Sequence, residues 1–126
     1  MLGKSLEEAS WLDLCSGSGV MACEALLHGV KRILAIEHQK KTASICKLNL
    51  ADISKQFENS IHLEVICKDV ISFLKKGPKN KNIKFLRDFP QNDPRFDFIF
   101  LDPPYESSIY QDCLEILLFQ KWIKNT

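Results

Sequence analysis

Four short apolar runs, separated by segments long enough to form helices, constrain the fold of this 126-residue chain more than any other feature. Their alternation with helix-length segments is typical of β-α-β units built on a parallel sheet. We therefore predict an α/β domain with helices on both faces of the sheet. The expected strands are Trp11–Leu14, Ile33–Ile36, Ile61–Cys67 and Phe96–Leu101, and the expected helices are Val20–His28, Lys40 to about Ser54, Val70–Leu74 and Ser107 to about Phe119.

Composition narrows the class of protein. With 45% hydrophobic and 26% charged residues, the chain resembles an ordinary globular domain, and no apolar run approaches the roughly 18 residues that cross a bilayer. The first ten residues lack the basic-then-apolar order of a signal peptide, so we expect a cytoplasmic protein. Five scattered cysteines without a C-x-x-C pair argue against a zinc site and against a disulfide framework.

A glycine-rich turn, Asp13-Leu14-Cys15-Ser16-Gly17-Ser18-Gly19, follows the first expected strand and leads into the first helix. The glycines allow a tight turn and let a ligand approach the backbone, while the helix N-terminus supplies unpaired N–H groups. Glu37 stands at the end of the second strand, where its carboxylate can accept hydrogen bonds from both hydroxyls of an adenosine ribose. The arrangement predicts a site for an adenosine-containing cofactor.

Two cofactors fit this turn. It satisfies the dinucleotide pattern G-x-G-x-x-A, so an NAD site and a nicotinamide-dependent oxidoreductase are one interpretation. Asp13 favours S-adenosylmethionine instead, because a carboxylate repels a pyrophosphate and attracts the ammonium of a methionine moiety. After the third strand, Asp69 is a candidate acceptor for an adenine amino group, with Val70 against the base. An Asp at a helix start also serves as a plain N-cap, and the two roles are compatible.

The motif Asp102-Pro103-Pro104-Tyr105, directly after the fourth strand, is the most specific feature of the sequence. Its two prolines fix φ twice and remove two N–H donors, which leaves a rigid loop with free carbonyl groups. Asp102 and the Pro103 carbonyl can then accept hydrogen bonds from one amino group, so that its nitrogen lone pair faces an electrophile. Tyr105 offers a flat face on which an extruded base can stack. The motif predicts a site for a nucleobase amine.

Together these motifs resemble class I S-adenosylmethionine-dependent methyltransferases. More narrowly, LDLCSGSGVMACEALLHGV, IEH, NL and FDFIFLDPPY are similar to segments of the RsmD family of 16S ribosomal RNA guanine-N2 methyltransferases. The resemblance implies a Rossmann-like fold, S-adenosylmethionine as cofactor, ribosomal RNA as partner and no metal. It implies catalytic contacts to the amine and base by Asp102, Pro103 and Tyr105, and cofactor contacts by Asp13, Ser16, Gly17, Ser18, Gly19, Glu37, Asp69 and Val70.

The sequence departs from the family pattern in three places. Fewer residues precede Trp11 than in family members, and the four expected strands are fewer than the family sheet contains. We therefore expect residues 1–126 to form a single, partial domain with strand order 3-2-1-4, whose apolar fourth strand is a bare edge prone to self-association. The third departure is a long polar segment, residues 75–95. Its clustered lysines make it a candidate contact for the RNA backbone, although a solvated face is the simpler interpretation.

Methyl transfer to a nucleobase amine is the function that these motifs favour, with a guanine of 16S ribosomal RNA as the expected target. A catalytically inactive cofactor- or RNA-binding module and a DNA adenine-N6 methyltransferase are the alternatives. A protein-glutamine methyltransferase fits less well, because that group typically has Asn where Asp102 stands. The expected chemistry is direct in-line transfer, which depends on positioning and on desolvation of the reactants.

Overall fold

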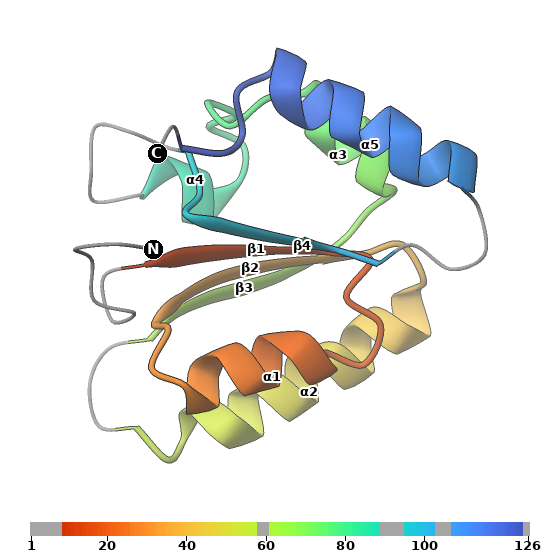
Figure 1. Ribbon diagram of the computed structural model, residues 1–126. Coiled ribbons are helices and arrows are strands. Elements are labelled where there is room, and N and C mark those ends of the chain that lie inside the picture. The colour runs from red at the N-terminus through yellow and green to blue at the C-terminus, as the bar shows by residue number, and fades with distance from the viewer. Residues whose placement is uncertain (1–8, 58–60, 89–94, 103–106, 125–126) are drawn as a thin grey trace.

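The computed structural model describes residues 9–57, 61–88, 95–102 and 107–124 (Figure 1). Strands and helices alternate along these residues, as the sequence predicted. None of the described helices has the length and apolar character needed to cross a membrane. The elements are β1 (Ser10–Leu14), α1 (Val20–Leu27), β2 (Arg32–Glu37), α2 (Lys40–Ser54), β3 (His62–Cys67), α3 (Val70–Lys75), α4 (Lys84–Arg87), β4 (Phe98–Leu101) and α5 (Ser107–Phe119).

The four strands form one parallel sheet in the order β3-β2-β1-β4, which confirms the predicted order. Leu12 of β1 pairs with Leu34 on one side and with Ile99 on the other. The chain therefore moves outward from β1 to β3 and then returns to place β4 on the opposite side of β1. In sheets of this kind, ligands bind outside the carboxyl ends of the strands where the order reverses, which here is between β1 and β4.

Helices cover both faces of the sheet: α1 and α2 lie on one face, and α3, α4 and α5 lie on the other (Figure 1). Side chains of each strand alternate between the two faces. In β2, for example, Ile33 and Ala35 pack with α1 and α2, whereas Leu34 and Ile36 pack with the other three helices. Because both faces are covered, the strands are nearly continuous apolar runs, as expected of a buried parallel sheet.

Phe96, the first residue of the predicted fourth strand, lies just before β4 and has a partner, so the prediction of a bare edge was wrong there. Ile123 forms a parallel bridge with Phe96, whose N–H donates to the Trp122 carbonyl at 2.7 Å. Trp122 is fully buried, and its indole N–H donates to the Leu74 carbonyl at 3.0 Å. The pairing segment is too short to show strand alternation in the sequence. Farther along, residues 98–101 pair only with β1 within the described part of the chain.

Polar contacts at the amino-terminal ends of β1 and β4 fix how the two strands sit beside each other. The N–H and hydroxyl of Ser10 donate to Oδ2 of Asp97 at 2.9 and 3.2 Å, and the Asp97 N–H donates to the Ser10 hydroxyl at 3.1 Å. The ammonium of Lys124 lies 3.4 Å from the same carboxylate. These contacts set the register that brings Asp102, just after β4, level with the turn that follows β1.

The polar segment after α3 is folded onto the sheet over the part that the structure describes. Its residues 84–87 form α4, as the sequence suggested for residues 83–89. Ile83, Phe85 and Leu86 are buried in the core, and the Phe85 N–H donates to Oε1 of Glu64 on β3 at 2.8 Å. This segment is therefore a covering element of the sheet, and only its residues 89–94 lie outside the description.

Candidate functional site

The predicted site residues meet at the carboxyl end of the sheet. Asp13 is near the end of β1, Glu37 is the last residue of β2, Asp69 follows β3 and Asp102 follows β4. Because parallel strands end at the same edge, four acidic side chains from four strands are brought to one side of the molecule. Asp102 itself is exposed. Pro103 and Tyr105, the other predicted catalytic residues, lie outside the described residues.

The glycine turn has the backbone geometry that its sequence requires. Gly17 and Gly19 have φ of 58° and 92°, in the left-handed region that favours glycine. A Cβ on Gly19 would lie 3.0 Å from the Cys46 sulfur, so this glycine lets the turn pack against α2. A Cβ on Gly17 would meet no atom within 4 Å. Gly17 therefore faces open space, where a ligand can touch the backbone.

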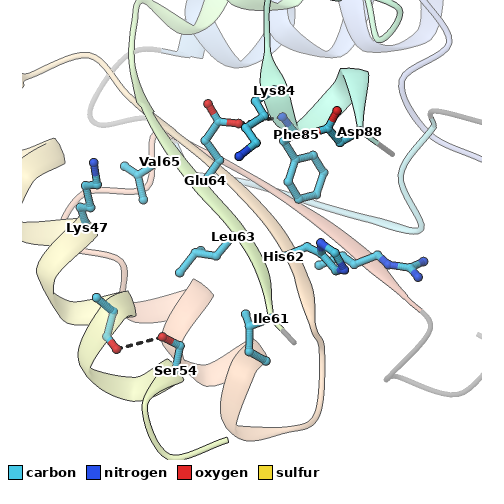
Figure 2. Close-up of a pocket in the computed structure, with 12 residues that line it drawn as sticks. Lys47, Ser54, Ile61, His62, Leu63, Glu64, Val65, Lys84, Phe85 and Asp88 are labelled. Atoms are coloured by element: carbon cyan, nitrogen blue, oxygen red, sulfur yellow. Dashed lines mark hydrogen bonds between the residues drawn. The ribbon is translucent and has the colours of Figure 1, made fainter. Parts of the chain in front are cut away.

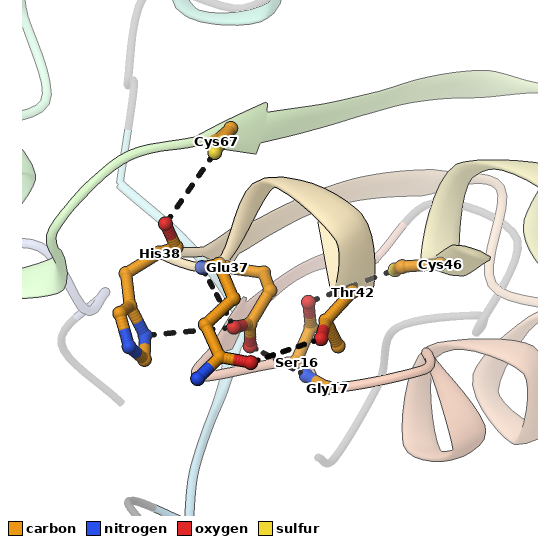
Figure 3. A network of polar contacts seen from close by, with 8 residues as sticks. Ser16, Gly17, Glu37, His38, Thr42, Cys46 and Cys67 are labelled. Carbon is orange, nitrogen blue, oxygen red and sulfur yellow. Dashed lines mark hydrogen bonds and ion pairs between the residues drawn. The ribbon is translucent and has the colours of Figure 1, made fainter. Parts of the chain in front are cut away.

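Glu37 ties the glycine turn to the end of β2 (Figure 3). Its Oε1 accepts a hydrogen bond from the Gly17 N–H at 2.9 Å, and its Oε2 accepts one from the Gln39 N–H at 3.0 Å. The side chain is only 6% exposed. The imidazole of His38 lies 3.5 Å from Oε2. Since each carboxylate oxygen has two acceptor sites, Glu37 can hold the turn and still accept further hydrogen bonds from ribose hydroxyls.

Asp13 is a buried carboxylate with an orphaned oxygen. The side chain is 1% exposed, and neither its Oδ2 nor the Trp11 indole nitrogen has a hydrogen-bond partner among the described residues. Burial raises the pKa of Asp13 to about 7. The nearby Trp11 indole N–H and the Ala22 backbone N–H in the first turn of α1 oppose this shift, while the charge of Glu37 adds to it. A buried acceptor of this kind fits a nearby cation.

Asp69 is the N-cap of α3, as one of its two predicted roles required. Its Oδ2 accepts a hydrogen bond from the Ser72 N–H at 3.0 Å, and the side chain is exposed. This contact occupies one carboxylate oxygen and leaves Oδ1 for another donor. Val70, the next residue, is buried in the core against α5 and presents little side-chain surface to a base.

Two residues of α2 support the turn, and the sequence analysis assigned neither of them to the site. The Asn49 side-chain amide donates to the Ser18 carbonyl at 2.9 Å. The Cys46 sulfur lies 3.6 Å from the Ser16 hydroxyl (Figure 3). An Asn within a helix is a weak helix former, and this was the available signal for Asn49. These contacts hold both ends of the glycine turn against one helix, so the turn is a fixed part of the fold.

Cys15, the first residue of the turn, is not equipped to act as a nucleophile. Burial raises the pKa of its thiol to about 11, and the nearby Cys113, Glu37, Asp13 and Asp69 add to the shift. At neutral pH the group is therefore a neutral thiol. Within the described ranges, no group of three or more His, Cys, Asp or Glu side chains is placed to hold a metal ion.

The whole chain matches a known protein family. The family model described as "Conserved hypothetical protein 95" matches residues 1–126. A Haemophilus influenzae protein named ribosomal RNA small subunit methyltransferase D is 30% identical over 119 residues, which cover 94% of this chain and 53% of that protein. The chain thus spans about half the length of the curated relatives it matches.

Solved structures share the same fold. A Haemophilus influenzae protein described as a methylase is 29% identical, with a TM-score of 0.73 over 94% of this chain and 64% of that one. An Escherichia coli protein described as a methyltransferase has a TM-score of 0.71 at 22% identity, over 94% of this chain and 56% of that one. At that identity the likeness shows the fold alone. Two S-adenosylmethionine-dependent methyltransferases with lower sequence identity, 20% and 13%, also share the fold, with TM-scores of 0.54 and 0.57.

Proposed function

Because this chain belongs to the family of conserved hypothetical protein 95, the RsmD family that its motifs resemble, we propose that it binds S-adenosylmethionine and methylates small-subunit ribosomal RNA. The observation that carries the proposal is the glycine turn locked to Glu37 at the point where the strand order reverses. The proposed target is the N2 amine of a guanine. The proposed place of action is the cytoplasm.

The residues present fit the proposed cofactor. The open space over Gly17 admits a ligand to the turn, and the free acceptor sites of Glu37 suit the two ribose hydroxyls. Oδ1 of Asp69 is available to the adenine amino group. The orphaned Oδ2 of Asp13 is an unused acceptor behind the turn, and a cation bound nearby would favour its ionised form, which suits the ammonium and sulfonium of S-adenosylmethionine better than the pyrophosphate of NAD. When bound, the cofactor supplies an electrophilic methyl group.

Asp102 is proposed to hold the substrate amine. Its carboxylate and the Pro103 carbonyl each accept a hydrogen bond from the amine, which directs the nitrogen lone pair at the methyl carbon. The bound cofactor would supply the methyl group and would keep the electron pair of the broken bond on its sulfur, and the amine held by these residues would give up its proton to solvent after the transfer. No strong base is required before attack. The residues contribute positioning and the exclusion of water, with Tyr105 stacking on the base.

Calorimetry with S-adenosylhomocysteine and with NAD tests the cofactor assignment. The proposal expects binding of the first and not of the second. It also expects that binding to be weaker in Glu37→Ala but unchanged in Glu115→Ala, where an exposed glutamate on α5 is removed. Preferential binding of NAD would contradict it. Methylation of small-subunit RNA, read by mass spectrometry of the nucleosides, then distinguishes N2-methylguanosine from N6-methyladenosine and from no product at all.

A further inference from the structure

A concave surface lies along the outer edge of β3, where it is lined by residues 61–65 and stops short of Cys67 at the carboxyl end of the strand. This groove has a volume of about 610 Å³. Figure 2 shows β3 as its floor, with Lys47 and Ser54 of α2 on one side and, on the other, Lys84 of α4 and Asp88 just after that helix. We refer to it as the β3 groove. The family motifs contribute none of the residues that line its two sides.

The cationic side chains of the β3 groove have no charged partner among the described residues, whereas its carboxylates accept hydrogen bonds. Arg32, Lys47 and Lys84 form no ion pair with any described residue. The two acidic residues of the lining are engaged: Oε1 of Glu64 accepts from the Phe85 N–H at 2.8 Å, and Oδ1 of Asp88 accepts from the Arg87 guanidinium at 3.2 Å. Within the described residues, the lining thus sets three cationic side chains without an ion pair against two carboxylates, a formal charge of +1 that favours an anion.

The floor of the groove adds backbone donors. The His62 N–H donates to the Lys31 carbonyl next to β2 at 2.7 Å, and the N–H groups of a parallel strand alternate between its two edges. The N–H groups of Leu63 and Val65, together with their carbonyls, therefore face the outer edge of β3. Cationic side chains and backbone N–H groups are both donors that proteins use to bind the phosphate oxygens of a nucleic acid.

We propose that the β3 groove binds the phosphodiester backbone of RNA through Arg32, Lys47 and Lys84. The choice of RNA over another polyanion rests on the proposed function. Arg32 starts β2 and Glu37 ends it, so the Arg32 end of the groove lies about 16 Å from the cofactor turn along the strand. One folded RNA can reach both places. The groove binds the RNA backbone independently of the base sequence. The carboxyl end of the sheet binds the target base.

The test compares two variants that each lose three positive charges. One neutralises the groove (Arg32→Gln, Lys47→Gln, Lys84→Gln). The control neutralises three exposed lysines of the preceding segment that do not line it (Lys75→Gln, Lys76→Gln, Lys79→Gln). Fluorescence anisotropy follows binding of a labelled single-stranded RNA of non-ribosomal sequence at several salt concentrations. Thermal melts and S-adenosylhomocysteine binding show whether each variant is folded.

The groove variant is expected to reduce the slope of log affinity against log salt by about 2, and to weaken binding about 100-fold near 0.1 M salt, whereas the control changes both far less. An equal effect in both variants, or no effect in the groove variant, overturns the proposal. So does displacement of the RNA by poly-glutamate as readily as by unlabelled RNA. If the triple variant does not fold, the double Lys47→Gln, Lys84→Gln variant, whose side chains are exposed, is expected to lower the slope by about 1.4.

The groove and the proposed function can fail separately. Groove-dependent RNA binding without methyl transfer contradicts the proposed function and leaves the groove in place. If the protein transfers methyl groups but the slope of log RNA affinity against log salt is the same in wild type and groove variant, only the proposed role of the groove is contradicted.

Discussion

The backbone N–H of Gly17 and Oε1 of Glu37 are joined by a 2.9 Å hydrogen bond that links residues 20 positions apart. This carboxylate therefore shapes the turn, and in the proposed function it also accepts hydrogen bonds from the ribose hydroxyls. Replacing Glu37 should therefore change both the stability of the glycine turn and the affinity for the proposed cofactor. The first prediction tests both effects.

Glu37→Ala is expected to weaken binding of S-adenosylhomocysteine by about 1.5–3 kcal/mol, the usual value of a hydrogen bond to a charged group. It should also lower the thermal midpoint, because the Gly17 and Gln39 N–H groups lose their acceptor. Calorimetry and thermal denaturation measure the two effects. Unchanged affinity would remove Glu37 from the cofactor site. A lower midpoint with unchanged affinity would reduce its role to support of the turn.

Asp102→Ala is expected to lower methyl transfer by about 100-fold or more, since the substrate amine loses its positioning group. Cofactor affinity and stability should change little, because this side chain is exposed. Single-turnover transfer from radiolabelled S-adenosylmethionine gives the rate. Asp112→Ala, at an exposed aspartate on α5, serves as the control. A variant with near wild-type transfer would show that the amine is held elsewhere.

Asp13→Asn is expected to flatten the pH dependence of stability between about pH 4 and pH 7. Burial raises the pKa of Asp13 from 3.8 to about 7, so the folded protein binds this proton more tightly than the unfolded chain does. Stability is therefore highest, for this group, below pH 4 and falls as the pH rises through 7, by at most about 4 kcal/mol. Denaturant titrations of wild type and variant across this range measure the difference. Parallel curves would mean that Asp13 titrates normally.

Asp69 allows its two roles to be separated. Asp69→Ala removes the N-cap of α3 and should cost about 1 kcal/mol of stability, whereas Asp69→Ser keeps a capping oxygen and should cost only a few tenths. If the carboxylate also binds the adenine amino group, both variants weaken cofactor binding by about tenfold. Wild-type affinity in Asp69→Ser would leave the residue as a cap alone.

The sheet order was predictable because each strand is an apolar run of strand length. Each connection between two strands has the length of a helix or turn and has turn-forming residues at its ends. Phe98–Leu101 and Leu12–Leu14 illustrate this: no polar residue other than Asp13 interrupts them. The carboxyl-end placement of Glu37, Asp69 and Asp102 then followed from the parallel arrangement. Their roles toward a cofactor and an amine remain proposals.

What the sequence did not reveal were contacts between distant residues. The Asn49 amide reaches the Ser18 carbonyl across 31 positions, and Glu64 accepts from Phe85 across 21. No local pattern encodes such pairs, because they depend on how helices pack on the sheet. The pairing of Ile123 with Phe96 was missed for the same reason. Self-association through the rest of the β4 edge stays a prediction, which sedimentation at increasing concentration can check.

The separations along the chain also divide the folding of the site into two events. The contacts that shape the glycine turn are made with Ile36, Glu37, Cys46 and Asn49, all within one β-α-β-α unit. The contact that registers β4, between Ser10 and Asp97, spans 87 positions. Closing the longer loop costs more entropy and non-local pairing is slower, so the turn can form before Asp102 arrives. A nascent chain thus gains a pocket for its cofactor before it gains the means to present a substrate to it.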